Sequence, residues 1–163
     1  MPTWPVRTVL DTNVMVRGIS HASSPSGRVL ALCDRRMTVP LISGVVLAEY
    51  RMVLGDPKIV ARYPEITNMK VETVLARLQY VGDIFRETRV RFTFPRDPKD
   101  AKFIELAIAG GATAIVTCDQ DLLELPAGRD DAAKRFRQRL PTTQIMRPED
   151  FVRWFEGAWP ALN

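Results

Sequence analysis

Short apolar runs rich in β-branched residues alternate with helix-period segments along the chain, and this alternation constrains the fold more than any other feature. Strands are expected at residues 6–10, 38–42, 114–118 and 142–146, with an extended run at 87–94. Helices are expected from near residue 14 and over 23–36, 45–56, 99–111 and 148–155, with one helix or a helical pair at 64–84. Alternating strands and helices favour a parallel sheet covered on both faces. We therefore predict a three-layer α/β/α sandwich with a mostly parallel central sheet.

The length of 163 residues fits a single domain over 1–163, with a basic helical insert at about 126–141. Lys and Arg number 23 against 19 Asp and Glu, a net charge of +4 that admits polyanionic partners but is also ordinary. Cys33 and Cys118 lie apart in apolar segments, which predicts reduced core thiols and no zinc site. The start lacks a signal-peptide apolar region, and no apolar run reaches the roughly 18 residues of a membrane span. We expect a cytoplasmic protein without a membrane segment.

Four acidic residues occupy positions where separate segments of such a sheet converge. Asp11 and Asp119 follow two of the expected strands, and ligands of open α/β sheets gather beyond the carboxyl ends of the strands. Asp100 opens the 99–111 helix, so its side chain points back past the helix N-terminus. Glu49 lies at the margin of an apolar stripe that faces the sheet, and can reach toward the strand ends. The sequence predicts one acidic site.

Each of these acids also has a structural interpretation. Asp11 and Asp119 could cap the helices that follow them, although Asn13 is the better cap for the first. Glu49 could be a solvated residue of a helix face. Asp100 could be a first-turn acid behind an Asp97 cap, stabilised by the helix dipole. These interpretations do not exclude a role at a shared site.

An acidic cluster of this kind calls for a cation. Like charges about 4 Å apart cost on the order of 4 kcal/mol per pair near a surface, and a divalent ion removes that cost. Oxygen ligands without histidine or cysteine favour Mg²⁺ or Mn²⁺, ions that bind phosphate oxygens and activate water for phosphodiester hydrolysis. His21 lies in an expected loop without an acid/base partner, and we interpret it as a surface residue. No GxSxG, GxxxxGK[ST] or GxGxxG motif offers another chemistry.

Supporting roles are expected for neighbours of the four acids. Asn13 could orient Asp11 through a hydrogen bond, and Thr117 could hydrogen-bond to Asp119 or to a water molecule. Asp121 is an auxiliary ligand or a plain helix cap. The basic residues closest in sequence to Asp100 are the candidates for gripping the substrate beside the ion, namely Arg96, Lys99 and Lys102. The basic residues of the insert could contact phosphates or form a solvated helix face.

The chain resembles the PIN-domain family of nucleases, whose bacterial members are often VapC-like toxins of toxin–antitoxin pairs. The matching pieces are VLDTNVMV, SPSGRVLAL, LISGVVLAEYRMVL, RDPKDAKFIELAIAGGATAIVTCDQDLL and IMRPEDF. By position, Asp11, Glu49, Asp100 and Asp119 match the catalytic, metal-binding acids of the family, with Asn13, Thr117 and Asp121 in its supporting places. The insert PAGRDDAAKRFRQRLP departs from the family, which usually has a shorter link there.

The resemblance implies a PIN-like fold, Mg²⁺ or Mn²⁺ dependence, RNA as substrate and frequent homodimers. The leading hypothesis is a metal-dependent endoribonuclease, the toxin of a pair held inactive by a protein antitoxin. One alternative is an RNA-processing or repair nuclease without an antitoxin. The other is a non-catalytic RNA-binding regulatory module whose acids serve only as helix caps.

Overall fold

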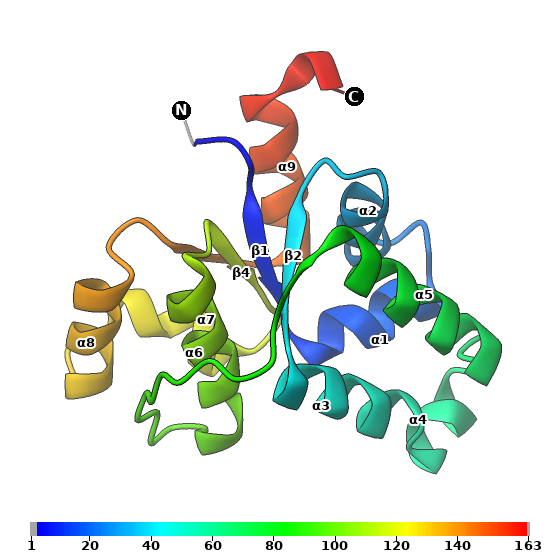
Figure 1. Cartoon of the computed structure of the whole chain (residues 1–163), viewed down its shortest axis with the longest axis horizontal. Helices are drawn as coiled ribbons and strands as arrows, with labels where there is room; N and C mark the ends of the chain where they lie inside the picture. Colours follow the sequence, from blue (N-terminus) through cyan, green and yellow to red (C-terminus); the bar gives the residue numbers. More distant parts are fainter. Residues whose placement is uncertain (1–2, 163) are drawn as a thin grey trace.

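The sheet is parallel throughout. The computed structural model describes residues 3–162, and their five strands pair in the order β3-β2-β1-β4-β5, each neighbour parallel to the next (Figure 1). The strands are β1 (Arg7–Leu10), β2 (Val39–Ser43), β3 (Asp83–Phe85), β4 (Ala114–Val116) and β5 (Gln144–Met146). This confirms the predicted α/β/α class.

Helices cover both faces of the sheet. They are α1 (Thr12–Ser20), α2 (Pro25–Asp34), α3 (Gly44–Leu54), α4 (Pro57–Arg62), α5 (Asn68–Val81), α6 (Ala101–Gly110), α7 (Gln120–Glu124), α8 (Asp131–Arg139) and α9 (Pro148–Ala158). Short 3-10 turns are η1 (Pro98–Asp100), η2 (Leu125–Ala127) and η3 (Pro160–Leu162). Figure 1 shows the strands between α6 and α8 on one side and α1, α2 and α5 on the other. None of the helices in the described part of the chain is both long and apolar enough to cross a membrane.

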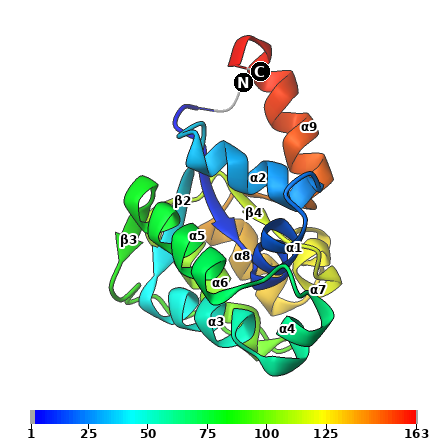
Figure 2. The same ribbon diagram turned by 90° about the vertical axis from the view of Figure 1, so that its right-hand side faces the viewer.

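The strand order creates a switch point beside β1. The chain runs outward from β1 through β2 to β3, and then returns by α6 to β4 on the other side of β1. Crossovers in opposite directions fall on opposite faces of the sheet, and a crevice opens between the two strands where the direction changes. Figure 2 shows both chain ends beside α9, at the end of the sheet where β1 begins. The edge at which β1 and β4 end therefore lies away from the chain ends, and a functional site can form there.

Helix α6 anchors the core on its face of the sheet. Phe103, Ile104 and Leu106 are fully buried, and the helix contacts β1, β2 and β4. It ends at Gly111, whose left-handed φ of 61° suits a residue without a side chain and lets the chain turn into β4. The start of α6 is thereby fixed relative to the strand ends.

One expectation about the middle of the chain is wrong, and a second is confirmed only in part. The extended run at 87–94 has no regular structure, and the strand lies earlier, at Asp83–Phe85. Strand β3 pairs only with β2, and β2 gives way to α3 after Ser43, so no neighbour remains for pairing beyond Phe85. The expected helix at 64–84 begins only at α5, after a Thr67 cap, and the preceding α4 was not predicted.

The basic insert forms a helix with one buried side. Helix α8 buries Ala132, Ala133 and Phe136, and Arg137 donates hydrogen bonds to the carbonyls of Pro126 and Gly128 at 2.9 and 2.8 Å. Part of its charge thus stabilises the connection to η2. The single-domain boundary at 1–163 stays a prediction.

Candidate active site

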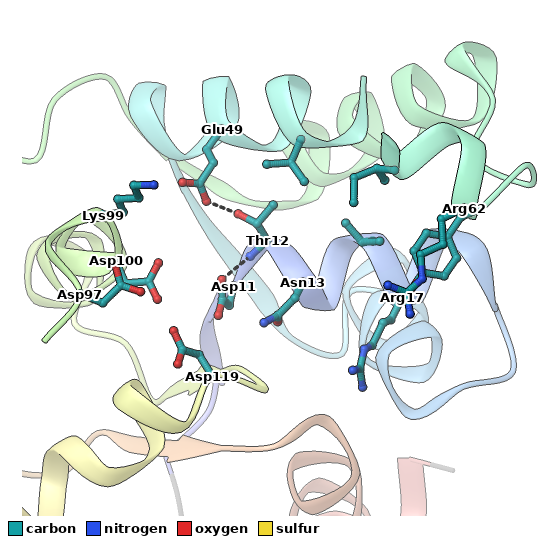
Figure 3. Close-up of a pocket in the computed structure, with 14 residues that line it drawn as sticks. Asp11, Thr12, Asn13, Arg17, Glu49, Arg62, Asp97, Lys99, Asp100 and Asp119 are labelled. Carbon is teal, nitrogen blue, oxygen red and sulfur yellow. Dashed lines mark hydrogen bonds between the residues drawn. The ribbon is translucent and has the colours of Figure 1, made fainter. Parts of the chain in front are cut away.

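Three carboxylates from distant parts of the chain meet at the switch point. Asp11 follows β1, Asp119 lies three residues after β4, and Asp100 stands at the start of α6. Each offers one oxygen, and the three oxygens lie within 4.8 Å of one another (Figure 3). Strand ends and a helix start therefore bring together three of the four predicted acids.

Asp11 is buried and held by two donors. It is 5% exposed, and it accepts hydrogen bonds from the amide of Thr12 and the hydroxyl of Thr117, both at 2.6 Å. The Thr117 oxygen also accepts from the amide of Asp119 at 2.9 Å. Thr117 thus links the first acid to the third. Asp11 itself is the N-cap of α1, so the expectation that Asn13 would be the cap is wrong.

Burial shifts the proton affinity of this cluster. Burial raises the pKa of Asp11 to about 6, with smaller contributions from the charges of Asp119 and Glu49, while the bonds from Thr117 and Thr12 act in the opposite direction. Burial also raises the pKa of Asp100 to about 9, helped by the adjoining Asp119 carboxyl and the charge of Asp11. The metal-free cluster therefore retains protons that ordinary carboxyls would lose, and a cation can replace them.

Asp100 makes no side-chain capping bond. It occupies the N-cap position of α6, and Asp97 occupies that of η1, but neither carboxylate accepts a capping hydrogen bond. Asp97 instead belongs to a second group of close carboxylate oxygens, with Asp119 and Asp121. The prediction had assigned Asp97 to capping alone. Asp97 lies in the RDPKD segment, three residues before Asp100. This closeness in sequence could have indicated that Asp97 belongs to the same site.

Glu49 lines the same cavity but lies outside the group of three. Its carboxylate accepts from the hydroxyl of Thr12 and forms an ion pair with Lys102. Lys102 was expected to bind the substrate. In the structure its ammonium group instead neutralises Glu49 at the rim of the cavity. Glu49 thus holds α1 and α6 together beside the cluster.

The other predicted residues take varied places. Arg96 is paired with Asp121 at 2.6 Å and with Glu124 at 2.8 Å, whereas Lys99 lines the cavity. Asn13 also lines it, and its Oδ1 is buried without a hydrogen-bond partner among the described residues. That oxygen can accept a hydrogen bond from a water molecule. His21 is exposed, as expected.

The donor set fits a hard divalent cation. All converging atoms are carboxylate oxygens, the ligands that Mg²⁺ and Mn²⁺ prefer. An ion of this kind keeps several waters, and the Asn13 oxygen is a ready acceptor for one of them. The residues present therefore fit the predicted Mg²⁺ or Mn²⁺ ion.

The cavity extends well beyond the acids. Its volume is about 470 Å³, and its far half is lined by residues that were not predicted to belong to the site, including Arg17, Arg62 and Tyr63. Arg17 and Tyr63 reach it from α1 and from the end of α4. Arg17 lies four residues after Asn13, on the same side of α1, and this spacing could have indicated it, but Tyr63 depends on the unpredicted helix α4.

Comparison with known proteins agrees with this geometry. Residues 7–121 match the PIN domain. The chain belongs to the PIN domain family. PIN domains are typically nucleases and generally use divalent metal ions, for which the acidic cluster is suited. The matched region ends before the basic insert, whose departure from the family stays a prediction.

One curated relative spans nearly the same length. "Uncharacterized protein MJ1680" of Methanocaldococcus jannaschii is 26% identical over 151 residues, which cover 93% of this chain and 92% of that protein. No solved structure matches the chain.

Proposed function

We propose that this PIN domain is a metal-dependent endoribonuclease that hydrolyses RNA phosphodiester bonds with Mg²⁺ or Mn²⁺. The observation that carries the proposal is the convergence of Asp11, Asp100 and Asp119 at the switch point of the sheet. Such a cluster is costly to maintain when empty, because at least two of its carboxyls have raised pKa values. Preference for RNA over DNA rests on the family resemblance.

The residues of the site have separable tasks. Asp11, Asp100 and Asp119 would hold the ion, and Thr117 fixes the orientation of the Asp11 carboxylate. A bound Mg²⁺ or Mn²⁺ polarises the phosphodiester and lowers the pKa of the attacking water. Lys99, at the edge of the cavity, can neutralise a phosphate of the substrate.

Helix capping does not account for Asp97 and Asp100, whereas Asp11 and Asp119 do cap α1 and α7. Asp100 and Asp97 stand at cap positions, yet their carboxylates accept no capping bond. A binding module with structural acids would use them as caps. This observation favours the nuclease over the non-catalytic alternative.

The biological role of the nuclease is also a proposal. By resemblance, the protein is a VapC-like toxin, a cytoplasmic homodimer neutralised by a protein antitoxin. A small adjoining reading frame for a DNA-binding protein, whose product co-purifies with this chain and suppresses cleavage, would support it. A nuclease active in the absence of any such neighbour would instead be an RNA-processing or repair enzyme.

Substitution of Asp100 tests the nuclease directly. Asp100→Asn should reduce Mn²⁺-supported cleavage of a labelled RNA by at least a hundredfold, while Asp150→Asn, an exposed acid on α9, should cleave as the wild type does. DNA of the same sequence provides the substrate comparison. Equal cleavage by Asp100→Asn and wild type would assign the activity to a contaminant and refute the proposal.

A further inference from the structure

The cavity that contains the acidic cluster continues along α1 toward a basic end. Thr12 and Asn13 line it near the acids, and Val16 and Arg17 line it one turn later. This spacing places all four on one side of the helix. At 1.5 Å per residue, the backbone of Arg17 lies about 9 Å beyond that of Asp11. The cavity is therefore a trough with an acidic end and a basic end.

The opposite wall of the cavity also runs from an acidic end to a basic end. Glu49 and, one turn later, Val53 line it from α3, while Ile59, Arg62 and Tyr63 close its far half from α4 and the residue after it. Figure 3 shows Arg62 and Arg17 at the end of the cavity opposite the aspartates. Between the two charged ends the lining is apolar.

The groups at the basic end are available to a ligand. Within residues 3–162, the side chains of Arg17 and Arg62 form no ion pair or hydrogen bond, whereas Arg96 is held by two carboxylates. Tyr63 is half-buried, with the Arg62 guanidinium 5.4 Å from its ring centroid and the His21 ring meeting it edge-on. Its amide donates to the carbonyl of Ile59 at 2.8 Å, which fixes its backbone.

Hydrolysis of a phosphodiester needs only the acidic end. The whole cavity, at about 470 Å³, lies within the roughly 300–1,000 Å³ typical of ligand sites, and its far half combines apolar and basic residues as a ligand pocket does. An aromatic ring beside unpaired arginines is the combination that binds single-stranded nucleic acid, through base stacking and phosphate contacts.

We infer that this half of the cavity binds one unpaired nucleotide beside the phosphodiester at the acidic cluster. Its base packs on Tyr63 and Val53, and the next phosphate contacts Arg17 and Arg62. The inference rests on the proposed function for the position of the cleaved bond. A base inside a duplex is paired and stacked, so it cannot enter without being flipped out.

Binding measurements test the base contact without any turnover. Asp100→Asn is used as the background, and Kd is measured with Mn²⁺ for a fluorescent tetrauridylate and for an abasic tetramer with the same phosphates. Adding Tyr63→Ala should weaken tetrauridylate binding roughly 5- to 150-fold, the range for loss of one stacked base. Binding of the abasic tetramer should change less than twofold. Tyr80→Ala, which removes an exposed ring on α5 outside the cavity, is the matched control.

The salt dependence of binding tests the phosphate contact. For single strands, each neutralised phosphate contributes about 0.7 to the slope of log K against log salt. The double variant Arg17→Gln/Arg62→Gln, which leaves that phosphate without a cationic partner, should lower the slope for tetrauridylate by an amount of this order. Arg153→Gln, on the exposed side of α9, should leave it unchanged.

The outcomes separate this inference from the nuclease proposal. Equal effects of Tyr63→Ala on both tetramers, or duplex RNA bound as tightly as single strands, would overturn the nucleotide site. If Tyr63 governs binding but the wild-type protein cleaves no RNA with Mn²⁺, the nuclease proposal fails and the nucleotide site stands. If Tyr63→Ala melts below the assay temperature, Tyr63→Leu retains apolar bulk without the ring and should give the same selective loss.

Discussion

Replacing Asp11 by asparagine should stabilise the metal-free protein at alkaline pH. Burial raises the pKa of Asp11 from an ordinary 3.8 to about 6, which corresponds to about 3 kcal/mol at about 1.4 kcal/mol per tenfold change in proton affinity. Because the pKa is higher in the folded state, the protonated acid stabilises the fold below pH 3.8, and this stabilisation is lost as pH rises through about 6. Asparagine stays neutral, and its amide can still accept from Thr12 and donate to Thr117.

Thermal melts in EDTA at pH 5 and pH 8 measure this effect. At pH 8 the Asp11→Asn variant should melt up to roughly 6–12 °C above the wild type, since 1 kcal/mol shifts Tm by about 2–4 °C at this size. At pH 5 the difference should shrink. Asp150→Asn, which changes an exposed acid, should show no such pH-dependent gain. A variant less stable than the wild type by the same amount at both pH values would refute the argument from burial.

Two further predictions concern the ion and its ligands. Mn²⁺ should raise the Tm of the wild type more at pH 8 than at pH 5, because protons compete with the ion for Asp11 and Asp100. At a concentration of 100 times Kd, an ion that binds only the folded state adds about 2.7 kcal/mol to the free energy of unfolding. An equal rise at both pH values would place the ion elsewhere. Thr117→Val keeps the buried shape but removes the donor to Asp11, so Mn²⁺ affinity measured by calorimetry should fall about 10- to 100-fold. Unchanged affinity would show that Thr117 does not position the ligand.

The sheet and the strand-end acids could be read from the sequence because local signals specify them. Strand β4 is a continuous apolar run, and β1 is buried after its first residue, as expected of strands covered on both faces; Asp11 follows β1 directly, and Asp119 lies three residues after β4. The start of α6 was signalled by a proline, and its end by paired glycines. Strand β3 was misplaced because its limits depend on where its partner β2 ends.

The basic half of the cavity could not be read in the same way. Tyr63 and Arg62 reach it only because α4, a helix of six residues, packs beside α3. A helix so short has weak periodicity, and its position comes from tertiary packing. The pairing of Glu49 with Lys102, 53 residues later, likewise follows from the approach of α3 to α6.

Capping and metal binding are complementary roles for these aspartates. Three helices begin at the acids: α1 after Asp11, α6 after Asp100 and α7 after Asp119, so three positive helix ends face one point. A carboxylate has about four acceptor sites, and a capping bond leaves others for an ion. Each helix end favours a negative charge by about 0.3–1 kcal/mol, less than the roughly 4 kcal/mol by which two such charges repel. The raised pKa values of Asp11 and Asp100 show that burial and repulsion outweigh the helix ends, and a divalent cation supplies the missing positive charge.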